Sequence, residues 1–200
     1  MTHTYYVHGR APNDSHPLLA FVAETPGVDA LYRDRAVPLE WTPLSLRLGR
    51  PEPRHPIMAD HLSLPTPVLT EKVARAIEEL KLPDVQLVPA VVEMPGREYP
   101  YFVLNVWNFI PCVDRTASDI TVDEDDPSCI RFIRRLVLDM KAIEEEVSPE
   151  RRLLFRLAES TSTYVFAQPV VDAILATSPE GIRFWPANGW GEGRAFRRGD

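Results

Sequence analysis

The sequence predicts an α+β domain with a mostly antiparallel, twisted sheet, two short helices packed on that sheet, and a proline-rich N-terminal part. Three observations predict it. Runs of aromatic and β-branched residues recur along the chain and suit half-buried strands. Two short segments combine a helix start with helical apolar spacing. The chain has 20 prolines in 200 residues, concentrated before Pro100, which favours short extended pieces and turns over long helices.

The segment from Leu153 to Trp185 predicts a strand, a short helix and a second strand. Residues 164–166 are aromatic or β-branched and suit a pleated surface. Pro169 then lies where the first helical turn is expected, and its missing N–H costs nothing there. Residues 177–181 contain a proline and a glycine that end the helix, so the next strand is expected at 182–185.

The clearest helix of the chain is expected immediately after Thr70, a good N-cap residue. Val73, Ile77 and Leu80 then fall on one face of the helix. Pro83 follows this run and ends the helix. The apolar face must pack against the predicted sheet.

A β-hairpin is predicted directly after this helix. Its strands are expected at 85–92 and 101–110, with a turn around Pro95 and Gly96. Pro89 lies inside the first strand and cannot donate a ladder hydrogen bond, so it indicates an edge position or a bulge.

The N-terminal part contains only brief apolar stretches between prolines. Residues 4–8 and 18–22 are candidate strands, and 44–48 alternates in hydrophobicity as a half-buried strand does. This part either extends the sheet or forms a small lobe. The expected organisation is a proline-rich part at 1–63, an α+β domain at 64–186 and a glycine- and arginine-rich tail at 187–200.

Between the hairpin and the C-terminal unit the sequence predicts a polar loop, a strand and a helical turn. The loop spans 113–126 and contains six carboxylates and one arginine. Residues 130–140 fit a strand or a helix, and we assign a strand, in which Phe132 alternates with Leu136 and Leu138. A short helical turn follows at 143–147.

Composition excludes several classes of protein. The formal net charge of −7 disfavours binding to nucleic acid and better suits a basic partner, although acidity alone often serves only solubility. No secretory signal or apolar run of bilayer length is visible, so neither membrane insertion nor export is expected. The two cysteines are too few for a disulfide scaffold, which favours a cytoplasmic location.

The sequence contains no recognisable catalytic, metal or cofactor motif. His55, Asp60 and His61 lie in a proline-rich loop without a second ligand cluster, so we expect no metal there. No phosphate-binding loop or nucleophile elbow is present. Cys112, with Asp114 two residues on, is either a nucleophile or, as is commoner for a lone cysteine, a small buried thiol.

Two groups of residues are candidates for binding a partner. The acidic loop is either a solvated surface or a contact surface for a basic partner, and the two tryptophans near the C-terminus are either a lid on the core or interface anchors. These residues are Asp119, Asp123, Glu124, Asp125 and Asp126 in the loop, and Trp185 and Trp190 in the C-terminal turn.

Several segments in order resemble immunity protein family eleven, a family of bacterial polymorphic toxin systems. The resemblance rests on VLTEKVARAIEEL, VQLVPAVV, YFVLNVWNFIPCVDRTASD, LLFRLAES and GIRFWP. The individual signature positions are Cys112, Asp114, Ser118, Phe155, Arg156, Gly181 and Phe184. The resemblance covers 64–186, and the sequence departs from it at Thr70 and at Gln168 with Pro169, where the family has serine-containing caps.

The resemblance implies a non-enzymatic antidote that binds a cognate toxin encoded nearby and blocks it in the cytoplasm. It assigns no catalytic residue, and it leaves structural roles for Asp114 as a turn acceptor and for Arg156 as the partner of a carboxylate. Two alternatives remain open. One is a small hydrolase or transferase that uses Cys112 and the acidic loop, and the other is an adaptor of a secretion apparatus.

Overall fold

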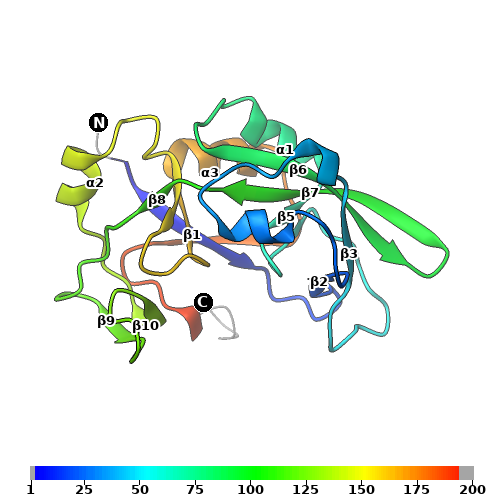
Figure 1. Cartoon of the computed structure of the whole chain (residues 1–200), viewed down its shortest axis with the longest axis horizontal. Coiled ribbons are helices and arrows are strands. Elements are labelled where there is room, and N and C mark those ends of the chain that lie inside the picture. Colours follow the sequence, from blue (N-terminus) through cyan, green and yellow to red (C-terminus); the bar gives the residue numbers. More distant parts are fainter. Residues whose placement is uncertain (1–2, 194–200) are drawn as a thin grey trace.

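The computed structural model describes residues 3–193 and has the predicted α+β fold, with most strand pairs antiparallel (Figure 1). One sheet has six strands, in the order β2 (Leu19–Phe21), β3 (Leu44–Leu48), β6 (Val85–Met94), β7 (Arg97–Val106), β5 (Val68–Leu69) and β4 (His61–Leu62). The pairing of β3 with β6 is parallel. The proline-rich N-terminal part therefore extends this sheet through β2, β3 and β4.

A second sheet contains both the first and the last strands of the chain. Its order is β13 (Ile182–Pro186), β1 (Tyr5–Arg10), β12 (Tyr164–Ala167), β11 (Leu154–Leu157) and β8 (Phe109–Ile110). β8 and β11 are parallel, and the other pairs are antiparallel. A separate two-stranded sheet pairs β9 (Asp119–Val122) with β10 (Ile130–Arg135).

The described chain has three α-helices, one more than predicted: α1 (Glu71–Glu78), α2 (Met140–Glu146) and α3 (Gln168–Ala176). α1 and α3 lie next to each other, whereas α2 lies at the left-hand end of the view in Figure 1. The helical turn expected at 143–147 overlaps α2, which ends one residue earlier. α2 also begins earlier than expected, because the carboxylate of Asp139 accepts hydrogen bonds from the N–H groups of Lys141 and Ala142. Two 3-10 helices are η1 (Val28–Tyr32) and η2 (Leu39–Trp41).

The predicted hairpin is confirmed as β6 and β7, whose ten residue pairs run without a register shift. β6 is an inner strand, yet Pro89 fits because the pairing of β6 with β3 begins only at Ala90. Pro89 thus occupies a locally free side of the strand and causes no bulge.

The single strand predicted at 101–110 is wrong, because the chain changes sheets at Asn108. β7 ends at Val106 in the six-stranded sheet, and β8 begins at Phe109 in the five-stranded sheet. The buried side-chain amide of Asn108 donates to the carbonyls of Arg151 (2.6 Å) and Leu154 (3.0 Å), which fixes the crossing point.

Buried apolar side chains form three groups, one between the two main sheets and one on the other face of each sheet. The central group lies between α1, α3, β7 and β12 and includes Ile77, Ile174, Leu104 and Phe166. A second group fills the other face of the six-stranded sheet beneath the segment that carries Ala30, Leu31 and Val37. The third packs the other face of the five-stranded sheet against β10 and α2, with Val7, Ile133, Ile143 and Phe155 as members. β7 is therefore buried on both faces.

A pair of histidines joins the two main sheets. His8 of β1 and His61 of β4 approach to 3.1 Å between Nδ1 and Nε2. The Nδ1 of His61 donates to the carbonyl of Gly181 (3.3 Å), so its Nε2 is the acceptor and the Nδ1 of His8 is the donor. Burial lowers the pKa of His61 to about 4 and holds the pKa of His8 well below its ordinary value. Both rings are therefore neutral at pH 7.

Candidate functional site

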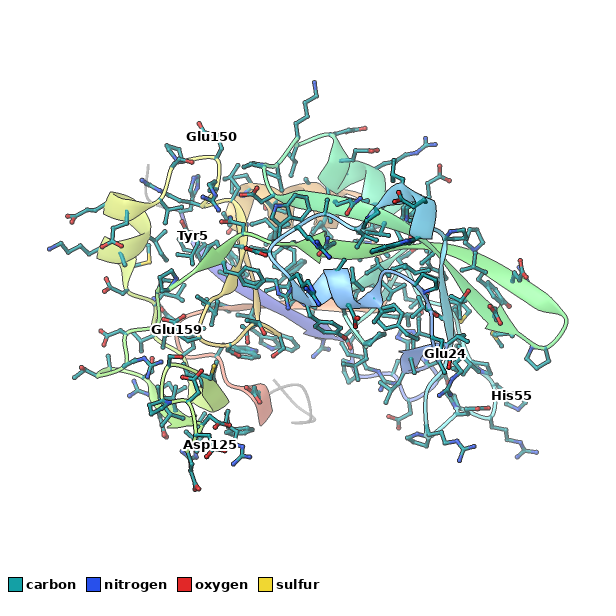
Figure 2. The ribbon with its side chains drawn as sticks, viewed as in Figure 1. Tyr5, Glu24, His55, Asp125, Glu150 and Glu159 are labelled. Atoms are coloured by element: carbon teal, nitrogen blue, oxygen red, sulfur yellow. The ribbon has the colours of Figure 1, made fainter. Side chains whose placement is uncertain are left out.

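The acidic segment forms a hairpin at one end of the molecule. The loop predicted for 113–126 is wrong at Asp119–Val122, which forms β9 and pairs with β10. In the turn, Oδ1 of Asp123 accepts the N–H groups of Asp125 (2.9 Å) and Asp126 (3.3 Å). The turn therefore has a defined shape, and Asp125 lies at the lower left of Figure 2, at the outer edge of the molecule.

Arginines of the same hairpin balance part of this negative charge. Arg134 forms an ion pair with Asp119 (3.0 Å), and Arg131 approaches Asp123 to 4.0 Å. Among the described residues, Glu124 and Asp125 form no ion pair. The tip of the turn thus keeps the uncompensated carboxylates, and the strands present mixed charge.

Asp126 is held in the ionised state by its neighbours. Its carboxylate accepts hydrogen bonds from the hydroxyl of Ser128 (2.5 Å) and the Sγ of Cys129 (3.3 Å). The hydrogen bond from Ser128 and then the one from Cys129 lower the pKa of Asp126, while the same carboxylate raises the pKa of the Cys129 thiol. Cys129 is exposed, but its raised pKa disfavours the thiolate form.

The hairpin also presents two apolar side chains that sequence reasoning missed. Phe132 is 40% exposed and Val122 is 37% exposed. Strict alternation had grouped Phe132 with the buried Leu136 and Leu138. Register shifts before Phe132 and after Ile133 break the alternation, so Ile133 is buried and Phe132 faces outward. Exposed aromatic rings are enriched at the centres of protein interfaces.

The two candidate tryptophans lie on different elements. Trp185 of β13 covers β1, and a Cβ at Gly9 would lie only 2.6 Å from its ring, so β1 needs glycine at that point. Trp190 packs against the group of buried residues that contains Ile133, and its carbonyl accepts the N–H of Leu136 (2.7 Å). Both rings are only partly buried.

A cleft of about 710 Å³ opens between the N-terminal segment, the loop at 63–67 and the turn at 161–163, and Trp190 lines one side of it. Arg156 of β11 also lines the cleft, although its side chain is only 3% exposed. The expectation that Arg156 pairs with a carboxylate is wrong for the described chain. Its guanidinium donates instead to backbone carbonyls and lies between the rings of Phe109 and Tyr164, each 5.0 Å away.

The comparisons with known proteins identify the family. The model of a family described as immunity protein family (Imm11) matches residues 32–189. The chain belongs to this family. The match includes the β9–β10 hairpin and Trp185, and it ends one residue before Trp190. No curated protein matches the chain.

Three residues of the family resemblance in the middle of the chain, Cys112, Asp114 and Ser118, are buried or hydrogen-bonded within the fold. Cys112 is 1% exposed, and burial raises the pKa of its thiol, with Glu159 and Asp139 adding to the shift. The carboxylate of Asp114 accepts two N–H groups of the following turn. The hydroxyl of Ser118 donates to the carbonyl of Val137 and accepts its N–H, so both polar signature residues shape the chain before β9.

The three residues considered as metal ligands do not converge. The carboxylate of Asp60 binds Lys72 (2.7 Å), Thr70 and the N–H of Glu180. Burial raises the pKa of Asp60, but these hydrogen bonds outweigh it, so the pKa is below its ordinary value. His61 faces His8, and His55 lies exposed at the right-hand end of Figure 2. Residues 3–193 contain no group of three or more histidine, cysteine or acidic side chains that could hold a metal.

None of the helices in the described chain has the length and apolar composition that crossing a bilayer requires. The glycine- and arginine-rich tail expected at 187–200 is described up to residue 193, where it folds back against β10. The rest of that predicted tail lies outside the described residues.

Proposed function

We propose that this Imm11 protein binds and neutralises a cognate toxin of a bacterial polymorphic toxin system, without catalytic activity of its own. The observation that carries the proposal is the family match over residues 32–189. The toxin would be encoded nearby, and neutralisation would take place in the cytoplasm of the producing cell. The surroundings of Cys112 support a non-enzymatic role, since a buried thiol with a raised pKa is a poor nucleophile.

The β9–β10 hairpin is the surface that we propose for toxin contact. Phe132 is the exposed aromatic side chain of β10, opposite Thr121 of β9, and the carboxylates lie on β9 and in the turn that follows it. Hot spots of protein interfaces combine this kind of aromatic centre with a polar rim that excludes water. The proposed contact residues also include Asp119, Asp123, Glu124, Asp125, Asp126, Trp185 and Trp190.

The charge of the protein supports a basic partner. A net charge of −7 with uncompensated carboxylates at an exposed tip attracts a basic domain and accelerates encounter. Fast capture matters because a toxin that acts catalytically causes damage until it is bound. A basic nuclease domain is the toxin class that we favour on these grounds.

Co-expression with the C-terminal toxin domain encoded beside this chain tests the proposal. We expect the toxin domain to kill cells when expressed alone and to be harmless when this chain is present. Calorimetry of the purified pair is expected to give nanomolar affinity, about −12 kcal/mol. Killing that continues in the presence of well-expressed, folded protein would contradict neutralisation.

A further inference from the structure

The cleft beside Trp190 contains a buried positive charge whose hydrogen-bonding capacity is only partly used. A guanidinium has five N–H groups. Nε of Arg156 donates to the carbonyl of Thr161, and Nη1 donates to the carbonyls of Leu31 (3.0 Å) and Val106 (3.4 Å). Nη2 makes no hydrogen bond with any residue of the described chain. Two N–H groups of a charged side chain therefore remain for a ligand.

The charge of Arg156 also lacks a counter-ion within residues 3–193. None of the ion pairs in that range includes Arg156, and the rings beside its guanidinium are those of Phe109 and Tyr164, each 5.0 Å away. Glu192, on another wall of the cleft, accepts the N–H of Ile133 instead. Burying a cation without an anion costs several kcal/mol, so this fold keeps an unfavourable charge that a bound carboxylate would stabilise.

The rim of the cleft favours an occupant carried by a protein. Tyr32 is 61% exposed and Leu64 is 46% exposed, and both line the opening. An apolar rim around a buried charge matches an acidic side chain presented by an apolar segment of a partner. The guanidinium suits a carboxylate because its planar N–H groups match the two carboxylate oxygens.

The cleft is continuous with the hairpin proposed for toxin contact. Trp190 lines the cleft and packs under β10. The next residue, Gly191, lies so close to β10 that a Cβ there would be 2.1 Å from the carbonyl oxygen of Arg134. A partner that contacts β10 therefore also contacts the surface next to the cleft.

We propose that the cleft receives an aspartate or glutamate side chain of the bound toxin, which pairs with the guanidinium of Arg156. This inference rests on the proposed toxin binding and adds to it a specific anchoring contact. The acidic hairpin then attracts the basic surface of the toxin, and Arg156 selects a toxin that carries a carboxylate at the matching position.

Calorimetry with the toxin domain encoded beside this chain tests the contact. Arg156→Gln is expected to weaken binding by roughly 30-fold or more, the loss typical of removing one partner of a buried charge pair. Because Arg156 also satisfies three carbonyls, a second variant leaves it intact: Ser162→Phe fills the exposed turn at the cleft and is expected to weaken binding similarly. Ser148→Phe, at an exposed serine outside the cleft, is the matched control and is expected to bind as the wild type does.

A second measurement examines the cleft without the toxin. Benzoate is expected to raise the melting temperature of the wild-type protein and to shift the guanidinium Nε–H resonance of Arg156, whereas neutral benzamide is expected to do neither. Equal toxin affinity for Ser162→Phe and Ser148→Phe would overturn the proposal. If the two variants bind the toxin equally and benzoate still binds the wild type, the cleft binds a free small carboxylate and not a toxin side chain. Failure of the wild type to bind the toxin domain would refute the proposed function, and the benzoate result would still report on the cleft.

Discussion

A β-hairpin lies toward each end of the long axis of the molecule, β6–β7 at one end and β9–β10 at the other (Figure 1). The two hairpins differ in length, register and burial. β6–β7 pairs ten residues of each strand without a register shift, and β7 has buried side chains on both faces. β9–β10 is short, has two register shifts and leaves Phe132 and Val122 exposed. The first hairpin has the construction of a scaffold, and the second has that of a presented surface.

The difference shows which apolar residues stabilise the fold and which are available to a partner. Leu104 in β7 is 1% exposed, and its burial contributes on the order of 2 kcal/mol. Phe132 leaves 40% of its surface in water, so its burial contributes a smaller share of its apolar surface to the stability of the free protein than that of Leu104 does. Mutations in the two hairpins should consequently separate stability from binding.

The largest expected effect is on stability, in the scaffold hairpin. Leu104→Ala is expected to lower the free energy of unfolding by about 2–5 kcal/mol, because it leaves a cavity between α1, α3 and β12. Val122→Ala, at a half-exposed position of the other hairpin, is expected to cost about 0.5–1 kcal/mol. Urea denaturation of both variants measures this difference, and equal losses would show that the two hairpins do not differ as argued.

Acid is expected to destabilise the fold through the buried histidine pair that joins the two main sheets. The pKa of His61 is about 4 in the folded protein and near 6.5 in the unfolded chain, so the unfolded state binds the proton first as the pH falls. Stability should therefore decrease from pH 6.5 to pH 4, by roughly 3 kcal/mol for His61 alone. The hydrogen bond from Ser128 lowers the pKa of Asp126, so its protonation is displaced to more acidic pH than that of an ordinary aspartate.

Denaturation at several pH values checks this expectation in two histidine variants. His61→Gln is expected to flatten the decrease between pH 6.5 and pH 4. His55→Gln, at an exposed histidine of the proline-rich loop, is expected to retain the full decrease. A decrease of the same size in both variants would assign the acid sensitivity to other groups.

The scaffold could be predicted from sequence because its signals are local. Thr70 and the apolar spacing after it predicted α1, and Pro95 with Gly96 predicted the turn between β6 and β7. The change of sheet at Asn108 could not be predicted, because the strands on both sides share one apolar run and the amide is satisfied by carbonyls 43 and 46 residues away.

For the β9–β10 hairpin, the sequence predicted the negative charge but not the exposed apolar side chains. The acidic residues were visible as a cluster, but the outward position of Phe132 depends on register shifts that no periodicity reveals. Arg156 was expected to meet a carboxylate, as a buried arginine usually does. The structure instead surrounds it with the carbonyl of Thr161 in the next turn, the carbonyls of the distant Leu31 and Val106, and two aromatic rings, and the distant contacts have no sequence signature.

A smaller effect, on binding alone, is expected in the presented hairpin. Phe132→Ala should weaken toxin binding by about 2 kcal/mol, a factor of roughly 30, because the ring would be the desolvated centre of the contact. Its melting temperature should remain close to that of the wild type. Leu175→Ala, at a similarly exposed position on α3, is the matched control for loss of an exposed apolar side chain and should bind normally.

The smallest expected effect concerns the charge of the turn. Replacing Glu124, Asp125 and Asp126 with Gln, Asn and Asn removes three charges but keeps oxygen acceptors for the hydrogen bonds of the turn. Surface charge chiefly changes the association rate, so a decrease of about tenfold in that rate is expected at low salt, with little change in the dissociation rate. Stopped-flow mixing at increasing salt should show the difference disappear as screening grows.

The three consecutive glutamates of α2, Glu144, Glu145 and Glu146, provide a control with the same change in net charge. If their replacement with glutamine slows association equally, the association rate depends on the total charge of the protein and not on the position of the charges in the turn. If only the turn variant is slow, the carboxylates at the tip guide the toxin to the hairpin that presents Phe132. The two results distinguish a uniformly acidic protein from one whose charge is arranged around its binding surface.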